Sequence, residues 1–204
     1  MPTIYDLKPK FQALLRPFCM RLADAGVTAN QVTLIASGLS LAHGAAHIMN
    51  PGAKWVLILL PIILFIRMAL NAIDGMLARE FGQASKLGAI LNELTDVISD
   101  AALYLPFAFI PGLPAPLVVV AVLLGVIAEM TGVIGVQIGA SRRYDGPFGK
   151  SDRAFFFGAL AILLIIFDPG RWSTVLIAFA CALSAATIVN RSRLALKEVQ
   201  NANS

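Results

Sequence analysis

The chain has 204 residues, of which 58% are hydrophobic and only 14% are charged, and its mean hydropathy is +0.78. Soluble domains usually carry about 25% charged residues, so this composition excludes an ordinary soluble protein and indicates a single all-α, polytopic integral membrane domain. The net charge of +4 does not point to nucleic acid, because the basic residues are distributed as in a membrane protein with a fixed orientation.

Residues 1–26 precede the first long apolar segment and combine apolar residues at helical spacing with lysines and arginines. The spacing predicts an amphipathic helix on the cytoplasmic membrane surface, where basic side chains meet anionic headgroups. The alternative is a solvated arm. Pro9 and Pro17 predict that such a helix is broken or kinked. The apolar residues are Ile4, Leu7, Phe11, Leu14, Leu15, Phe18 and Leu22, and the basic ones are Lys8, Lys10, Arg16 and Arg21.

Residues 27–190 hold six apolar segments, each approaching the roughly 20 residues that a spanning helix needs. The segments are 32–49, 55–75, 88–110, 116–140, 154–169 and 172–190. Residues 191–204 are expected to form a cytoplasmic tail, of which 197–204 are expected to be frayed. Pro- and Gly-rich turns separate several of them, as at 111–116 and 168–171. The sequence therefore predicts six transmembrane helices after the interfacial helix.

The sixteen lysines and arginines orient these spans. With the N-terminus in the cytoplasm, thirteen of them lie on the cytoplasmic side, Lys54 and Arg171 lie on the other side, and Arg67 lies inside the second span. Positive charge is enriched in cytoplasmic loops, so we expect both termini in the cytoplasm.

Polar residues gather where the second span ends and the third begins. Asn71 and Asp74 are three residues apart on one predicted helix, and Asn92, Asp96 and Asp100 recur every fourth residue on the next. Residues at these spacings share a helix face, so two antiparallel helices direct their oxygens at each other near the cytoplasm. Such oxygens suit a hard divalent cation. The alternative is a structural network that pairs these acids with Arg67, Arg79 and Lys86.

This stretch resembles the signature of the CDP-alcohol phosphatidyltransferase family, D-x2-D-G-x2-A-R-x8-G-x3-D-x3-D. The chain matches it without a gap from 71 to 96, with Asn at the first and third Asp positions. The residues aligned with the signature are Asn71, Asp74, Gly75, Ala78, Arg79, Gly88, Asn92 and Asp96, of which the two asparagines differ from it. The segments at 27–33 and 146–154 also resemble family elements.

The resemblance implies a transferase of phospholipid biosynthesis in the cell (inner) membrane, with its active site at the cytoplasmic face. Such an enzyme moves a substituted phosphoryl group from a CDP-alcohol, here CDP-diacylglycerol, to an acceptor alcohol and releases CMP. It implies Mg²⁺ or Mn²⁺ at Asn71, Asp74, Asn92, Asp96 and Asp100, with Asp96 as the base for the acceptor hydroxyl. It also implies a homodimer. The acceptor, a small alcohol or a second lipid, is not readable from the sequence.

The resemblance further implies a set of substrate-binding residues. Gly75, Ala78 and Gly88 are small enough for a nucleotide to approach the backbone, and Arg79 can bind a phosphate with two hydrogen bonds. The other members are Asn30, Thr33, Lys150 and Arg153. Glu129, inside the fourth span, is expected to face the protein interior and to serve helix packing.

The two asparagines leave three interpretations open. The chain is a working variant with altered metal geometry, a one-metal enzyme, or a catalytically retired protein that binds nucleotide or lipid without turnover. Asp100 or Glu93 is a candidate to replace a missing metal ligand. Arg67 lies one turn before Asn71, where its side chain can occupy part of the space left by a missing carboxylate. A cation transporter is disfavoured because the outer halves of spans two and three offer almost no polar residues.

Overall fold

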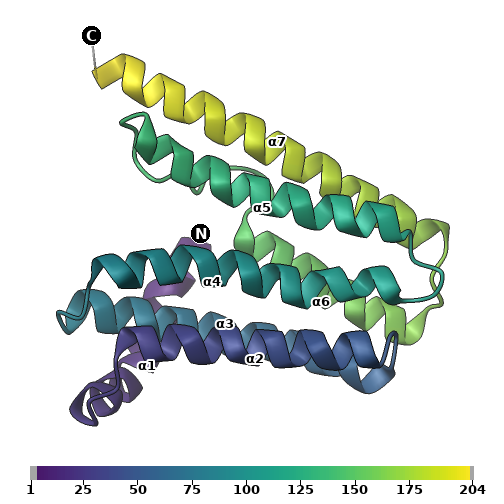
Figure 1. Cartoon of the computed structure of the whole chain (residues 1–204), viewed down its shortest axis with the longest axis horizontal. Helices are drawn as coiled ribbons and strands as arrows, with labels where there is room; N and C mark the ends of the chain where they lie inside the picture. The colour runs from purple at the N-terminus through teal and green to yellow at the C-terminus, as the bar shows by residue number, and fades with distance from the viewer. Residues whose placement is uncertain (1–3, 203–204) are drawn as a thin grey trace. The chain divides into compact units, whose positions relative to one another are not determined.

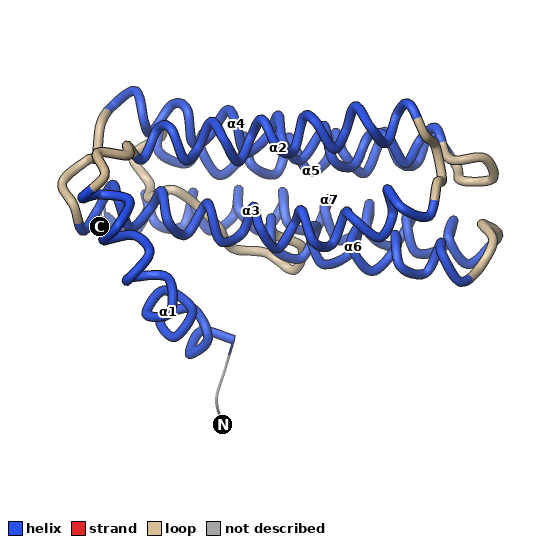
Figure 2. The backbone as a smooth tube through the Cα atoms, turned by 90° about the horizontal axis from the view of Figure 1, so that it is seen from below, coloured by secondary structure: helices blue, strands red, loops and turns tan. Residues whose placement is uncertain are grey.

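The computed structural model describes residues 4–202, and it describes side chains from residue 11 onward. Within residues 4–202 the chain is built from helices joined by short loops, without a strand (Figure 2). In chain order (Figure 1) these are α1 (Ile4–Asp24), α2 (Ala29–Met49), α3 (Lys54–Glu80), α4 (Lys86–Tyr104), the 3₁₀ helix η1 (Leu105–Phe109), α5 (Ala115–Gln137), α6 (Lys150–Ile166) and α7 (Arg171–Ala202).

A helix is present at each of the six predicted spans. Four of these helices, α2, α3, α5 and α7, are long and apolar enough to cross a membrane. The all-α membrane class predicted from composition is therefore confirmed. Helices α4 and α6 are shorter, with 19 and 17 residues, and their crossing of the membrane stays a prediction.

Three local predictions were wrong. The third span does not continue as one α-helix to residue 110, because Pro106 has no backbone N–H to donate and the chain changes to 3₁₀ geometry at Leu105. The end of the tail, predicted to fray over 197–204, is helical as far as Ala202. Helix α1 runs from Ile4 to Asp24 without a break at either proline, and a kink there stays a prediction. The side chains of Ile4, Leu7, Lys8 and Lys10 lie outside the described residues.

The chain divides into two compact units, which we describe separately. The first unit contains α1, most of α2, the C-terminal part of α3 and most of α4, in residues up to Ala42 and Ile62–Ser99. Its core joins α1, α2 and α3 through Cys19, Val32, Met76 and Leu77, all at most 3% exposed. This packing fixes the end of α3 on which the polar motif begins.

The second unit comprises His43–Pro61 and the chain from Asp100 onward. Helices α5 and α7 pack side by side along their lengths (Figure 1), and η1 packs against α5. Tyr104 stacks on Phe157 with ring centroids 4.2 Å apart, and Phe107 meets the same ring edge-on at 5.3 Å. These aromatic contacts join the end of α4 and η1 to α6.

Candidate active site

The whole predicted motif from Asn71 to Asp96 lies in the first unit, on the last turns of α3 and the first turns of α4. The loop between these helices is short, and Gly82 adopts a positive φ of 69° there, which favours glycine. The side chain of Gln83 accepts a hydrogen bond from Ala29 N–H at 2.7 Å and donates to the Val27 carbonyl at 3.3 Å. The loop is thereby fixed to the start of α2.

Asp96 is held by two nitrogen donors from α3. The Nδ2 atom of Asn71 donates to Asp96 Oδ1 at 3.3 Å. The Nη2 atom of Arg67 lies 3.4 Å from the same oxygen and 3.0 Å from the Asp96 backbone carbonyl oxygen. Arg67 was predicted to take up vacated charge in this region, and the structure pairs it with Asp96. The carboxylate that is the candidate base therefore has a fixed position between two helices.

Asp74 is buried, with 5% of its surface exposed. The Thr33 hydroxyl, on α2, donates to Asp74 Oδ2 at 2.7 Å. Thr33 was predicted to contact the nucleotide; in the structure it orients a carboxylate of the motif, and nucleotide contact stays a prediction. Thr33 from α2 thus contacts one of the two remaining acids, and Arg67 and Asn71 from α3 contact the other.

Two glycines of the motif provide room for polar side chains. A Cβ atom at Gly75 would lie 2.9 Å from Arg79 Nη2, so the Arg79 guanidinium folds back over the glycine one turn earlier. A Cβ atom at Gly88 would lie 2.8 Å from Asn30 Oδ1. Gly88 therefore allows the start of α4 to approach Asn30 on α2. Ala78 packs against the core of the unit, while Arg79 and Asn92 are exposed.

Helix α1 is tied to the end of α3 by an ion pair. Arg16 donates to both carboxylate oxygens of Glu80, at 2.9 and 3.0 Å. These hydrogen bonds raise the pKa of Arg16 above its usual value. Both side chains are well exposed, so the pair positions α1 more than it stabilises the fold.

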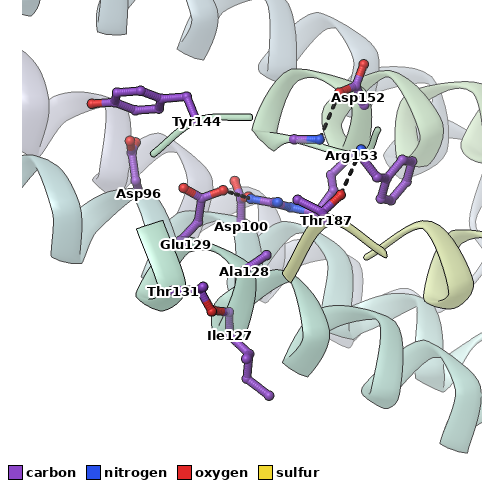
Figure 3. A network of polar contacts seen from close by, with 12 residues as sticks. Asp96, Asp100, Ile127, Ala128, Glu129, Thr131, Tyr144, Asp152, Arg153 and Thr187 are labelled. Carbon is purple, nitrogen blue, oxygen red and sulfur yellow. Dashed lines mark hydrogen bonds and ion pairs between the residues drawn. The ribbon is translucent and has the colours of Figure 1, made fainter. Parts of the chain in front are cut away.

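A second polar cluster lies within the second unit and surrounds Glu129 on α5 (Figure 3). Arg153 Nη2 donates to Asp100 Oδ2 and to Glu129 Oε1, each at 3.0 Å. Arg142 Nη2 lies 3.0 Å from Glu129 Oε2, and Arg191 Nη1 lies 3.4 Å from Oε1. Glu129 is 7% exposed, as expected for a residue that faces the interior. Its partners could not be read from the sequence.

Asp100, the last of the predicted metal ligands, pairs with an arginine of α6. Asp100 belongs to the second unit, is 6% exposed and forms an ion pair with Arg153. Arg153 is 3% exposed, so both residues are committed to a buried pair. Lys150 lies at the first position of α6, where Asp152 accepts a hydrogen bond from Gly149 N–H at 2.8 Å. The roles of Asp100, Lys150 and Arg153 in binding stay predictions.

Comparison with known proteins identifies the family. The family described as CDP-alcohol phosphatidyltransferase matches residues 26–186, which is most of the chain and includes the whole motif. The chain belongs to the CDP-alcohol phosphatidyltransferase family. The resemblance predicted from the motif is thereby confirmed, as is the assignment of the chain to this class of enzyme.

Individual relatives show how far the similarity extends. The chain is 48% identical to the inner membrane protein YnbA of Escherichia coli over 195 residues, which is 95% of this chain and 96% of that one. It is 36% identical to the archaetidylinositol phosphate synthase of Pyrococcus horikoshii, over 98 residues that cover 48% of this chain and 49% of that one.

Solved structures of the phosphatidylinositol phosphate synthase of Mycobacterium tuberculosis have the same fold. The structure with manganese and citrate matches with a TM-score of 0.72 at 19% identity, over 88% of each chain. The structure with CDP-DAG bound matches with a TM-score of 0.71 at 20% identity, over 90% of this chain and 92% of that one. At this identity the comparison establishes the membrane fold alone.

The motif of this CDP-alcohol phosphatidyltransferase offers oxygen atoms of the kind that divalent cations take as ligands. It offers the carboxylates of Asp74 and Asp96 and the neutral amide oxygens of Asn71 and Asn92. Within the described part of the chain, no group of three or more His, Cys, Asp or Glu side chains is arranged to hold a metal ion. Two carboxylates and added amide oxygens form an adequate oxygen set for a single Mg²⁺ or Mn²⁺, which also retain water ligands.

Proposed function

We propose that the chain transfers the phosphatidyl group of CDP-diacylglycerol to an acceptor alcohol and releases CMP. The observation that carries this proposal is the fixed carboxylate of Asp96, held at the motif position of the base by donors from Arg67 and Asn71. Support for the donor comes from the synthase of the same fold that binds CDP-DAG. The two asparagines are the observation behind the catalytically retired alternative, and the similarity to phosphatidylinositol phosphate synthases does not favour it.

In the proposed reaction, the acceptor hydroxyl oxygen forms a bond to the phosphorus that carries the diacylglycerol. The bond from that phosphorus to the CMP oxygen breaks, and the electron pair leaves with CMP. Asp96 takes the proton of the acceptor hydroxyl, as a general base within hydrogen-bond reach can do. Arg79, folded over Gly75, binds a phosphate of the donor through its planar fork of N–H groups.

A divalent cation held by Asp74 and Asp96, with the amide oxygens of Asn71 and Asn92, would supply charge stabilisation to the donor's pyrophosphate. Thr33 keeps the Asp74 carboxylate in one orientation through its 2.7 Å hydrogen bond. Gly88 allows the start of α4 to lie close to Asn30 on α2, and Ala78 packs against the core of the unit. These residues bind and orient, whereas Asp96 alone moves a proton.

The proposed topology places this chemistry at the cytoplasmic face of the inner membrane. Six crossings with both termini in the cytoplasm put thirteen of the sixteen basic residues on that side. The relative YnbA is described as an inner membrane protein. Reporter fusions after Asn50, Gln83 and Pro111 test this topology. It requires the reporters after Asn50 and Pro111 to lie outside the cytoplasm and the reporter after Gln83 to lie inside it.

The function is tested by CMP release from the purified protein in CDP-diacylglycerol vesicles, with Mn²⁺ or Mg²⁺ and a pool of candidate alcohols. We expect metal-dependent CMP formation that EDTA abolishes, and a lipid product that identifies the acceptor. Asp96→Asn should lower the rate by about 100-fold or more, because the base is lost. The matched control, Asp168→Asn at an exposed loop between α6 and α7, should keep the rate. Full activity of Asp96→Asn would remove that residue from the base role.

A further inference from the structure

Two buried histidines on α2 lie outside the motif of the candidate active site. His43 is 5% exposed and His47 is 0% exposed. They are the two histidines of the chain, and their spacing of four residues places both on one face of the helix. Two histidines at this spacing can bind one metal ion from a single helix.

The ring nitrogens of this pair lack hydrogen-bond partners. Among the described residues, neither nitrogen of His47 has a partner, and Nε2 of His43 has none. A neutral imidazole carries one N–H donor and one lone pair, so His47 leaves both unused. A buried polar group without a partner destabilises the fold. The pair is therefore better suited to holding a ligand than to joining helices.

Helix backbone and an aromatic ring pack around the pair. Phe107 of η1 is fully buried and meets the His47 ring edge-to-face, with ring centroids 5.1 Å apart. Gly44 lies between the two histidines in the sequence, and a Cβ atom there would collide with the backbone carbonyl of Ala102. Helix α2 thus lies directly against α4 at this point, and all of these residues belong to the second unit. This packing holds both imidazoles in a rigid part of the fold.

The distance between the two imidazoles fits an ion between them. The ring centroids of His43 and His47 are 6.0 Å apart, with the ring planes at 60°. A metal–nitrogen bond of about 2 Å and a ring radius of about 1 Å place two rings on opposite sides of one ion at roughly 6 Å. Ligands at a tetrahedral angle would bring the same centroids to roughly 5 Å. The pair therefore favours two nearly opposed ligands.

The donor atoms also favour an ion of low charge. Imidazole nitrogens are neutral, and the other ring that packs on His47, that of Phe107, is uncharged. Burying a divalent ion costs roughly four times as much as burying a univalent one, because the Born cost rises with the square of the charge. Hard cations take oxygen ligands, whereas copper accepts imidazole. Cu⁺ combines a single charge with affinity for imidazole and a preference for two opposed ligands.

We propose that His43 and His47 form a binding site for one Cu⁺ ion. Each imidazole donates the lone pair of one nitrogen to the ion and keeps its proton on the other nitrogen. The site shares no residue with the motif at 71–96, and it goes beyond the proposed transferase function without resting on it.

Nitrogen NMR of the full chain with ¹⁵N-labelled histidine tests the proposal. The chain has two histidines, so without a histidine tag the spectrum reports on these two imidazoles alone. Protein in detergent is titrated with Ag⁺, which has the charge and ligand preference of Cu⁺ and is stable in air. We expect one nitrogen signal of each ring to shift and to split through coupling to silver. Unchanged signals, as a buried water would leave them, or a shift in one ring alone would overturn the proposal.

The stoichiometry is measured in a chain without thiols. Cys19→Ala with Cys181→Ala removes both cysteines, which bind the same ions, and the wild-type chain is titrated in parallel. Both histidine signals should reach their end point together at one Ag⁺ per chain. End points that differ between the two rings would show two separate ions and would contradict a shared site.

Thermal unfolding in the same cysteine-free chain separates binding from folding. Ag⁺ that binds the folded chain should raise its thermal midpoint. His47→Leu removes a buried polar group without a partner, so it should keep the midpoint of the metal-free chain and lose the rise with Ag⁺. The control Ser40→Ala removes a buried hydroxyl of α2 that donates to the Ala36 carbonyl, and it should keep the rise. An equal rise in both variants would contradict the proposal.

Zn²⁺ tests the argument from charge and geometry. Zn²⁺ takes about four ligands in a tetrahedral arrangement, so equimolar Zn²⁺ should leave the silver-split signals in place. Displacement of bound Ag⁺ by equimolar Zn²⁺ would show a site for a divalent ion and would overturn the assignment to Cu⁺. These measurements involve no turnover, so a failure of the transferase function would leave their outcome unchanged.

Discussion

At the scale of single residues, the candidate site depends on side chains that orient the two acids. The hydroxyl of Thr33 donates a hydrogen bond to the carboxylate of Asp74, a residue that is 5% exposed. Thr33→Val should lower the free energy of unfolding by about 1–3 kcal/mol, since a buried acceptor loses its donor. It should also weaken Mn²⁺ binding. Thr131→Val is the control, because that hydroxyl donates to the carbonyl of Ile127 on its own helix; an equal effect of both variants would contradict the orienting role.

The glycine at position 75 gives a second prediction at this scale. Gly75→Ala places a Cβ atom 2.9 Å from the Arg79 guanidinium and should displace it. We expect the KM for CDP-diacylglycerol to rise by about tenfold, the cost of a charged hydrogen bond to phosphate. Gly38→Ala, where a Cβ meets nothing within 4 Å, should leave the KM unchanged. Adding Arg79→Ala to Gly75→Ala should cause little further loss, and an additive loss would show that the two residues act independently.

At the scale of elements, the loop between α3 and α4 is anchored to the start of α2 and so holds the two helices that carry the site. Gln83→Ala removes its hydrogen bonds with Ala29 N–H and the Val27 carbonyl. The free energy of unfolding should fall by about 1–3 kcal/mol, measured by thermal unfolding in detergent. Gln200→Ala, at an exposed position near the end of α7, is the matched control. A Gln83 variant as stable as the control would exclude an anchoring role for this loop.

The sequence predicted elements well and tertiary partners poorly. Apolar length placed a helix at every expected span, and the spacing of Asn71 and Asp96 correctly predicted that these two residues meet between α3 and α4. Apolar length did not predict the change from α to 3₁₀ geometry near Pro106, because hydropathy does not reflect the missing backbone N–H of a proline. The sequence also did not show which residue pairs with Arg67. Its charge was evident, but only the packing of α3 on α4 brings it to Asp96.

At the scale of the whole molecule, Glu129 balances arginines from three later segments. Glu129→Gln would leave the guanidinium groups of Arg142, Arg153 and Arg191 without their shared carboxylate. Breaking a buried ion pair from one side costs about 3–5 kcal/mol, so we expect a large drop in the thermal midpoint in detergent. Glu80→Gln, which removes an exposed pair with Arg16, should cost at most about 1 kcal/mol. Similar midpoints for the two variants would show that the buried network does not stabilise the fold.

The Glu129 cluster has a consequence for how the protein is made. Synthesis delivers α5 first, then the segment with Arg142 and Arg153, and last the part of α7 that carries Arg191. Until those segments have been synthesised, Glu129 lies in an apolar helix without the arginines that pair with it in the complete chain. A nascent chain that stops before Arg142 therefore has none of the guanidinium groups that pair with this carboxylate in the complete chain. Because Arg191 lies on α7, the full set of partners for this carboxylate exists only once the last helix has been made.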